Sequence, residues 1–287
     1  MALKDKVIVT CALTGAVTTK KQCEAIPYTA LEIAEEARRA WEAGAAVVHI
    51  HGREDNGQPS YRKEVFAAYR DEIRKRCPII LNFSTGAVGL PMQERVGHIV
   101  ECKPEIGALN AGSLTYAKYS QKRKQFVFDF VFGNPFSDIT YLLRQMNEVG
   151  VRPECELFDT GHVENLEPLI DMGLLKPPCD VNLVMGVLGG MRATPETLSF
   201  IVSQLRPGTL WKTTPISHMT WPLTAAALAL GGNVRVGLED NFYLPDRRMV
   251  KSNGELVAQA TAMARAIGRE PASVDEAKKM LGLGAAA

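Results

Sequence analysis

Apolar and polar positions along the chain follow two alternating patterns. Short apolar runs rich in β-branched residues are typical of buried strands, and a longer amphipathic stretch with helical periodicity follows each of them. The predicted strands are 7–13, 46–51, 78–84, 106–112, 154–159, 181–187, 209–215 and 233–240. The predicted helices are 30–43, 61–76, 92–102, 137–149, 162–173, 195–205, 222–230 and 253–268.

This alternation predicts a closed parallel barrel. Eight strand–helix units are the number at which a parallel sheet closes with every strand buried on both faces. We therefore predict a single (β/α)8 TIM barrel over residues 1–287, with a C-terminal helical extension from about residue 270. An open doubly wound sheet would usually carry a G-x-G-x-x-G turn after its first strand, whereas CALTGAVTT has one glycine only.

The amino-acid composition excludes several classes of function but does not bear on the fold. The 33 basic and 32 acidic residues leave a net charge of +1, so no overall field attracts nucleic acid or an anionic membrane. No stretch approaches the roughly 20 apolar residues that span a bilayer, and the first residues lack a signal-peptide core. The six cysteines show no CxxC spacing, so we expect reduced thiols, a cytoplasmic protein and small-molecule partners.

Two histidines stand one residue apart in the second predicted strand, in the segment VVHIHGRED at residues 47–55. Alternate side chains of a barrel strand face inward, so His49 and His51 share one face near the strand's carboxyl end. Active sites of such barrels are built at that end. A single strand histidine is more often a hydrogen-bonded core residue, but a pair at this place favours a ligand set.

A third ligand is available where Glu239 and Asp240 end the eighth predicted strand. Alternate barrel strands contribute to one interior layer, so strands two and eight present side chains at the same height beside strand one. Two imidazoles and one carboxylate form a catalytic zinc arrangement with an open position, and the same set holds iron in oxygenases. We therefore predict His49, His51 and Glu239 as metal ligands.

The eighth strand leaves one question open. Arg235 shares the inward face of the strand with Glu239, whereas Asp240 points away if the strand stays regular. A catalytic role for Asp240 therefore requires a bend or bulge at this point. Without one, Asp240 is a surface or capping aspartate.

Polar and basic residues follow other predicted strands at the same end of the barrel. Ser84, Asn110 and Ser113 suit substrate positioning, although ordinary turn chemistry explains them equally well. The glycine amides of MGVLGGM, residues 185–191, are candidates for contact with an anionic ligand. The segment KYSQKRKQ, residues 118–125, is either a solvated basic loop or a clamp for a polyphosphate cofactor.

Several segments together resemble the β-keto acid cleavage enzymes over about residues 6–281: CALTGAVTTK, LEIAEEARRAWEAGAAVVHIHGREDNGQPS, STGAVG, LNAGS, GVLGGM, RVGLEDNFY and SNGELVAQA. The pairing of HIHGRED with GLEDN in this order is the specific part. The resemblance implies a zinc-dependent barrel enzyme, with one zinc ion per chain, that uses acetyl-CoA as co-substrate. It implies condensation with a β-keto acid, CoA transfer and retro-Claisen cleavage to acetoacetate and a new acyl-CoA, and a homo-oligomer such as a tetramer.

The resemblance also implies a role for each matching position. It makes Asp240 the general base, held and kept ionised by Arg235. The metal ligands it implies are His49, His51 and Glu239, and the matching substrate-binding positions are Ser84, Gly86 and Ser113.

Two positions depart from the pattern of members that act on an amino-substituted acid. Ser113 replaces a threonine and keeps the hydroxyl group. Val17 stands where those members carry an acidic residue, and a valine cannot pair with a buried ammonium group. We therefore expect Val17 to contact a substrate whose substituent is neutral or apolar.

Two other functions compete with this one. Metal-dependent hydrolases of the amidohydrolase type place HxH on the first strand and further histidines on strands five and six, which here read ECELFD and VNLVMGV. A non-enzymatic barrel that holds a purely structural metal would need a closed fourth ligand, for which His162 and His218 are the candidates.

Overall fold

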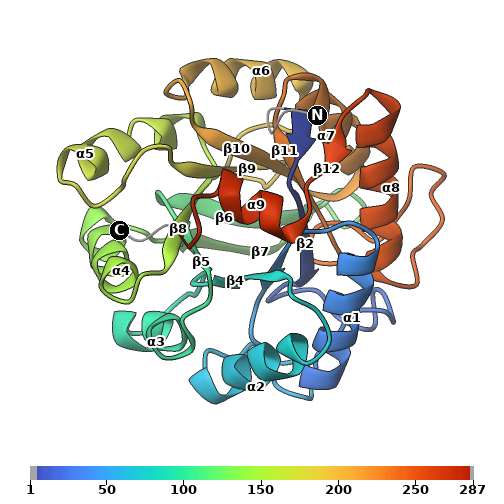
Figure 1. Ribbon diagram of the computed structural model, residues 1–287, viewed down its shortest axis with the longest axis horizontal. Coiled ribbons are helices and arrows are strands. Elements are labelled where there is room, and N and C mark those ends of the chain that lie inside the picture. Colours follow the sequence, from blue (N-terminus) through green and yellow to red (C-terminus); the bar gives the residue numbers. More distant parts are fainter. Residues whose placement is uncertain (1–4, 285–287) are drawn as a thin grey trace.

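Eight of the apolar runs form parallel strands that close into a barrel in the computed structural model, which describes residues 5–284 (Figure 1). The (β/α)8 prediction is therefore confirmed, while residues 1–4 and 285–287 of the predicted domain lie outside the described part. In chain order the barrel strands are β2 (Val9–Thr14), β3 (Val47–Ile50), β4 (Ile80–Ser84), β5 (Ile106–Asn110), β8 (Arg152–Leu157), β9 (Asp180–Met185), β10 (Leu210–Pro215) and β11 (Asn233–Val236).

Amphipathic helices surround the barrel and bury their apolar faces against the outward side chains of the strands. The predicted helix 162–173 is divided into a 3-10 turn, Thr160–Val163, and a short α5. Pro168 has no backbone N–H to donate to the carbonyl group of Glu164, so one continuous helix cannot form here. The helices of the ring are α1 (Ala30–Glu42), α2 (Lys63–Arg74), α3 (Met92–Cys102), α4 (Phe136–Glu148), α5 (Leu166–Asp171), α6 (Pro195–Gln204), α7 (Thr220–Ala229) and α8 (Asn253–Ala266).

The C-terminal segment closes the amino end of the barrel. β12 (Glu270–Pro271) pairs with β1 (Lys6–Val7), and α9 (Val274–Met280) follows it. Val274 and Ala277 of α9 pack against residues at the start of the barrel strands, including Ile80. In Figure 1 this helix lies over the nearer end of the barrel. No helix within residues 5–284 is long and apolar enough to cross a membrane.

An antiparallel hairpin of β6 (Leu114–Ser120) and β7 (Gln125–Phe132) lies at the opposite, carboxyl end, behind the barrel in Figure 1. Its base packs in a cluster with Phe158 and Val187, which follow two barrel strands. The prediction of a loop at 118–125 is therefore wrong in part, because residues 118–120 continue a strand and residues 121–124 make the turn. The alternation of phenylalanines in QFVFDFVF is typical of such a strand.

Candidate active site

The three predicted metal ligands meet at the carboxyl end of the barrel. β3 carries His49 and leads directly to His51, Glu239 follows β11, and β2 lies between these two strands. The Nε2 atom of His49 is 3.7 Å from Oε2 of Glu239, and that of His51 is 3.5 Å from Oε1. Two ligand atoms on one tetrahedral zinc ion, each bonded at about 2.1 Å, are about 3.4 Å apart. The spacing therefore fits a shared ion better than direct hydrogen bonds.

The burial and hydrogen bonding of these three residues also suit a metal site. The Oε2 atom of Glu239 is buried and has no hydrogen-bond partner within residues 5–284. The side chains of His51 and Glu239 remain 15% and 17% exposed, so a ligand can approach them from the carboxyl end. Burial, with help from the charge of Arg235, holds the pKa of His49 well below its usual range, so this imidazole is neutral as a metal ligand requires.

A turn at Gly237 places Glu239 and Asp240 at the carboxyl end of the barrel, beside the two histidines. Gly237 has a φ of 151°, and a Cβ atom there would overlap the carbonyl oxygen of Ala12. The amides of Asp240 and Asn241 both donate to the Gly237 carbonyl at 3.0 Å, so β11 ends at Val236 rather than at residue 240. This turn is the bend that a catalytic role for Asp240 requires.

The guanidinium group of Arg235 holds three carboxylates together. Its Nε and Nη2 atoms donate to the two oxygens of Asp240 at 3.0 and 3.1 Å. Nη2 also donates to Oε1 of Glu239 at 2.6 Å, which leaves Oε2 of that carboxylate free. Nη1 donates to Oε1 of Glu156 at 3.3 Å. Arg235 is 2% exposed, so these interactions form away from bulk water and orient all three acids.

The shared cation affects the three acids differently. Burial raises the pKa of Asp240 above its usual range, although Arg235 acts in the opposite direction. Burial also acts to raise the pKa of Glu239, but the charge of Arg235, together with His51 and His49, lowers it and keeps this carboxylate ionised. A general base works best when its pKa is close to the working pH, so the environment of Asp240 suits a base and that of Glu239 a permanent anionic ligand.

Glu156, on β8, is a residue that the sequence analysis missed. Burial raises the pKa of Glu156 to about 7, with Arg235 opposing the shift. The signal was present, because Glu154 and Glu156 are two acids spaced for one face of an apolar strand, ECEL. Acids at buried strand positions need partners, and Arg235 is the partner of Glu156.

A second buried network lies deeper in the barrel and involves Glu154. The Nζ atom of Lys212 is 2.6 Å from Oε2 of Glu154 and 3.1 Å from Oδ1 of Asp180, and Asn82 donates to Glu154 at 2.8 Å. Within the described residues, His49, Glu154 and Glu156 are also close enough to share an ion. Because Lys212 and Asn82 already satisfy Glu154, we favour the trio that contains Glu239.

Three predicted substrate-positioning residues lie beside His51. A Cβ atom built on Gly86 would be 3.3 Å from Oγ of Ser84, 3.6 Å from Nδ2 of Asn110 and 3.7 Å from Cε1 of His51. The Oγ atom of Ser84 accepts a hydrogen bond from the amide of Gly86 at 3.1 Å. The Oδ1 atom of Asn110 is buried without a partner among residues 5–284. Glycine at position 86 leaves open the space between these polar groups that a Cβ atom would fill.

Ser113 and the two other candidate histidines lie apart from the trio. Ser113 is exposed, and its Oγ accepts from the amide of Asn134 at 2.7 Å. Both ring nitrogens of His162 contact the backbone, at Ser113 O and Phe158 N, and His218 is exposed on a 3-10 turn. Within residues 5–284 neither histidine belongs to a group that could hold a metal, so neither supplies the closed fourth ligand of a structural site.

Val17 lies on the loop that follows β2, with 67% of its surface exposed. Buried Arg53 shapes this loop: it donates to the carbonyl groups of Gly15 and Thr18, the latter at 2.8 Å. Its guanidinium carbon also lies 4.6 Å from the ring centroid of Tyr28. No role for Arg53 was predicted from the sequence. Its place two residues after His51 is the signal that could have indicated a structural role at the site.

The glycines of the 185–191 segment serve packing rather than anion binding. A Cβ atom on Gly189 would overlap the carbonyl of Thr115 in β6, and one on Gly190 would overlap the carbonyl of Phe158. The amides of Gly186 and Gly190 donate within their own loop, to Met191 and Val187. The suggestion that these amides meet an anionic ligand is therefore wrong for the two that are bonded.

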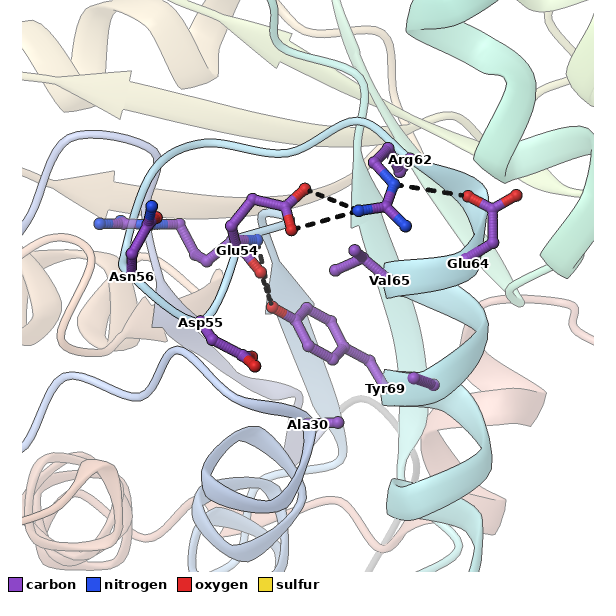
Figure 2. Close-up of a pocket in the computed structure, with 10 residues that line it drawn as sticks. Ala30, Glu54, Asp55, Asn56, Arg62, Glu64, Val65 and Tyr69 are labelled. Atoms are coloured by element: carbon purple, nitrogen blue, oxygen red, sulfur yellow. Dashed lines mark hydrogen bonds and ion pairs between the residues drawn. The ribbon is translucent and has the colours of Figure 1, made fainter.

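A cavity of about 500 Å³ lies between the 53–62 loop and helices α1 and α2 (Figure 2). Inside it, Arg62 lies 3.4 Å from Glu54 and 3.7 Å from Glu64. None of the predicted ligands lines this cavity. Arg62 is already paired with two of its acids, so we place the candidate site at the carboxyl end of the barrel instead.

Known proteins resemble this chain over nearly its whole length. A family model described as beta-keto acid cleavage enzyme matches residues 6–283. The 3-keto-5-aminohexanoate cleavage enzyme of Acetoanaerobium sticklandii is 37% identical over 281 residues, 97% of this chain and 99% of that protein. The 3,5-dioxohexanoate:acetyl-CoA acetone transferase of Paraburkholderia graminis is 33% identical over 306 residues, covering 100% and 99%. The apo structure of ObcA shares the fold, with a TM-score of 0.76, 22% identity and coverage of 91% of this chain and 66% of its own, just under two thirds.

Proposed function

The chain belongs to the beta-keto acid cleavage enzyme family, and from this premise we propose a zinc-dependent reaction between a β-keto acid and acetyl-CoA. The products are acetoacetate and a new acyl-CoA. The observation that carries the proposal is the arrangement of His49, His51 and Glu239 at metal-sharing distances beside Asp240, which Arg235 orients.

We propose that His49, His51 and Glu239 hold one zinc ion per chain. Their nitrogen and oxygen donors suit this ion, and the free Oε2 atom of Glu239 is available to it. When bound, zinc supplies Lewis acidity that polarises a keto group and makes the neighbouring C–H bond more acidic. The rest of the chemistry falls to side chains of the protein.

In this proposal Asp240 removes a proton from the carbon between the keto group and the carboxylate of the substrate. Arg235 donates to both oxygens of Asp240 and so fixes its orientation. Ser84, Gly86 and Asn110 lie beside His51 and provide a hydroxyl, an open approach to the backbone and an amide for holding the substrate. Ser113 contributes a further hydroxyl at the rim.

The carbon that loses its proton then forms a bond with the thioester carbon of acetyl-CoA, and the carbon–sulfur bond of the thioester breaks to release the CoA thiolate. The thiolate attacks the former keto carbon, and the bond between that carbon and the carbon that lost its proton breaks in a retro-Claisen step. The acetyl group leaves in acetoacetate, and the remainder of the β-keto acid leaves as its CoA thioester. Asp240 returns its proton to the carbanion of acetoacetate, so atoms and charges balance without a covalent enzyme intermediate.

We propose that the substituent of the β-keto acid is neutral or apolar. Valine at position 17 offers no charge to an ammonium group, and it is exposed on the loop that follows β2. The names of the relatives include both an amino-substituted and a dioxo-substituted acid, so the family accommodates either kind.

One assay tests this function. The purified protein is incubated with acetyl-CoA and a panel of aliphatic, dioxo and amino-substituted β-keto acids, and acetoacetate and the new acyl-CoA are quantified with and without a chelator. We expect equal amounts of the two products, loss of both with chelator, and preference for a substrate without an ammonium group. Preference for the amino-substituted acid would contradict the role of Val17, and absence of turnover with every acid would contradict the function.

The remaining expectations are also proposals. We propose that residues 1–287 form one barrel domain with the helical extension from about residue 270. The buried, free thiols of all six cysteines support a reducing, cytoplasmic environment. Val127 and Val131, on the hairpin, are 45% and 70% exposed and support a homo-oligomer such as a tetramer, which light scattering would test.

A further inference from the structure

The turn of the β6–β7 hairpin gathers cations that have no acidic partner. Within residues 5–284 no ion pair involves Lys118, Lys122, Arg123 or Lys124, whereas the exposed Arg206, Arg248 and Arg265 are each paired with a glutamate. Asp129 is the one acid of the segment 114–132, so its formal charge is four minus one, or +3, in a chain of net charge +1. A hairpin with this charge attracts a polyanion.

Aromatic rings form two groups on the hairpin, separated by a register shift between Lys118 and Tyr119. The ring of Tyr116 stacks on Phe130, with centroids 5.5 Å apart and an angle of 14°, and on Phe128, with 6.0 Å and 15°. Phe128 lies opposite Lys118 in the register of the two strands. Closer to the turn, Phe126 contacts Tyr119 with centroids 5.4 Å apart and is 57% exposed. Exposed aromatic faces stack well on nucleobases.

The base of the hairpin is close to the candidate active site. The amide of Ala117 donates to the carbonyl of Leu188 at 3.2 Å, which fixes β6 to the loop that follows β9. Burial raises the pKa of Tyr116 to about 12, and the charges of Glu239 and Asp240 add to the shift. The phenol of Tyr116 therefore lies within the field of Glu239 and Asp240, at the carboxyl end of the barrel.

The length of the hairpin is similar to the length of a coenzyme A arm. From Tyr116 to the end of β6 at Ser120 the chain advances four residues, about 14 Å in a strand, and the turn with its long lysine and arginine side chains extends beyond that point. This matches the reach of an extended pantetheine arm, which separates the reactive thioester of a coenzyme A ester from its phosphates. A ligand that reacts beside Asp240 and lies along the hairpin would place its phosphates at the turn.

We propose that the hairpin is the binding arm for coenzyme A, with Lys122, Arg123 and Lys124 of the turn at its phosphates and Phe126 and Tyr119 beside its adenine. This proposal rests on the proposed function, which makes acetyl-CoA the co-substrate. Arginine and lysine donate charge-assisted hydrogen bonds to phosphate oxygens, so several unpaired cations together recognise this group rather than the thioester.

The test compares ligands with and without phosphates. Lys122→Gln/Arg123→Gln removes two charges at the turn and leaves the backbone bonds of the hairpin intact. The matched control, Lys176→Gln/Lys279→Gln, removes two exposed charges from the amino end of the barrel. Calorimetry measures the Kd of coenzyme A, of adenosine 3′,5′-bisphosphate and of pantetheine for each variant, with inorganic phosphate as an additional ligand.

We expect the turn variant to bind coenzyme A about tenfold more weakly than the wild type and the control. The turn variant should also bind adenosine 3′,5′-bisphosphate more weakly, whereas pantetheine should bind all three proteins with the same Kd. The KM for acetyl-CoA should rise with ionic strength in the wild type and less in the turn variant, with little change in the KM for the β-keto acid.

Unchanged binding of coenzyme A in the turn variant would overturn the proposal, and so would equal weakening of pantetheine. Comparable loss in the control variant would assign the effect to net charge and would also overturn it. Binding of inorganic phosphate as tightly as the bisphosphate would show a general anion site instead of a coenzyme site. If the wild type shows no turnover, the proposed function fails, but calorimetry still decides the role of the hairpin.

Discussion

Arg235 donates to both carboxylate oxygens of Asp240, at 3.0 and 3.1 Å, and both residues are buried. Such a two-point contact fixes the plane of the carboxylate, so the proposed base keeps one orientation. Since the same guanidinium holds Glu239, the proposed base and a proposed metal ligand keep a constant separation. The account depends on this link between proton removal and metal binding.

The substitution Asp240→Asn separates the two functions. An asparagine has nearly the same shape but cannot accept the proton, so we expect kcat to fall about 10³-fold. The metal content should stay at the wild-type value, because Glu239 and the histidines are unchanged. Wild-type turnover by Asp240→Asn would eliminate Asp240 as the base.

Arg235→Lys tests the orientation of the acids. Lysine keeps the charge but cannot donate to Asp240 and Glu239 in the geometry of the guanidinium fork. We expect kcat to decrease about 100-fold, with a weaker affinity for the metal, as measured by steady-state kinetics and competition with a chelator. If kcat and metal affinity both match the wild type, charge alone suffices and the fork geometry is irrelevant.

Gly237→Ala tests the turn that delivers Glu239 and Asp240. A methyl group at residue 237 meets the carbonyl of Ala12, and alanine rarely adopts a φ of 151°. We expect the free energy of unfolding to drop by about 3 kcal/mol and the metal content to fall. Gly89, whose Cβ would meet nothing within 4 Å, offers a control position with positive φ but without the overlap. Equal effects of the two substitutions would mean that backbone strain, not the overlap, matters.

Acid should remove the contribution of Glu32 to stability. Burial acts to raise its pKa, but hydrogen bonds from Lys20 and from the amides of Tyr28 and Thr29 lower it to about 2. Since the folded pKa lies below the unfolded value of about 4.3, the contribution is complete above about pH 4.5 and is lost as the pH falls towards 2.

Urea unfolding between pH 7 and pH 3 measures this contribution as the difference between the wild type and Glu32→Gln. The difference in unfolding free energy should be largest above pH 5 and should shrink as the solution becomes more acidic. A difference that is constant over this range would show that the ionised form of Glu32 is not the stabilising one.

The barrel was predictable because its signals are local and repeated. Each strand is a short buried run and each helix a periodic one, so eight independent segments give the same fold. The convergence of His49, His51 and Glu239 also followed, because barrel geometry places strands two and eight on either side of strand one. Their role as ligands stays a prediction.

Features that depend on contacts between loops were not predictable in the same way. The hairpin packs on loops from distant parts of the chain, and the glycines at 189 and 190 are explained only by the backbone they meet. The position of Asp240 depended on a turn at Gly237, since the strand period alone points the side chain outward. Glu156 was missed because the partner that justifies its burial, Arg235, is 79 residues away.

Metal analysis of the purified protein tests the central claim most directly. We predict one zinc ion per chain in the wild type, none in His49→Ala, and turnover that a chelator abolishes and added zinc restores. Full turnover by metal-free protein, or a His49→Ala variant that keeps both its zinc and its activity, would contradict the account.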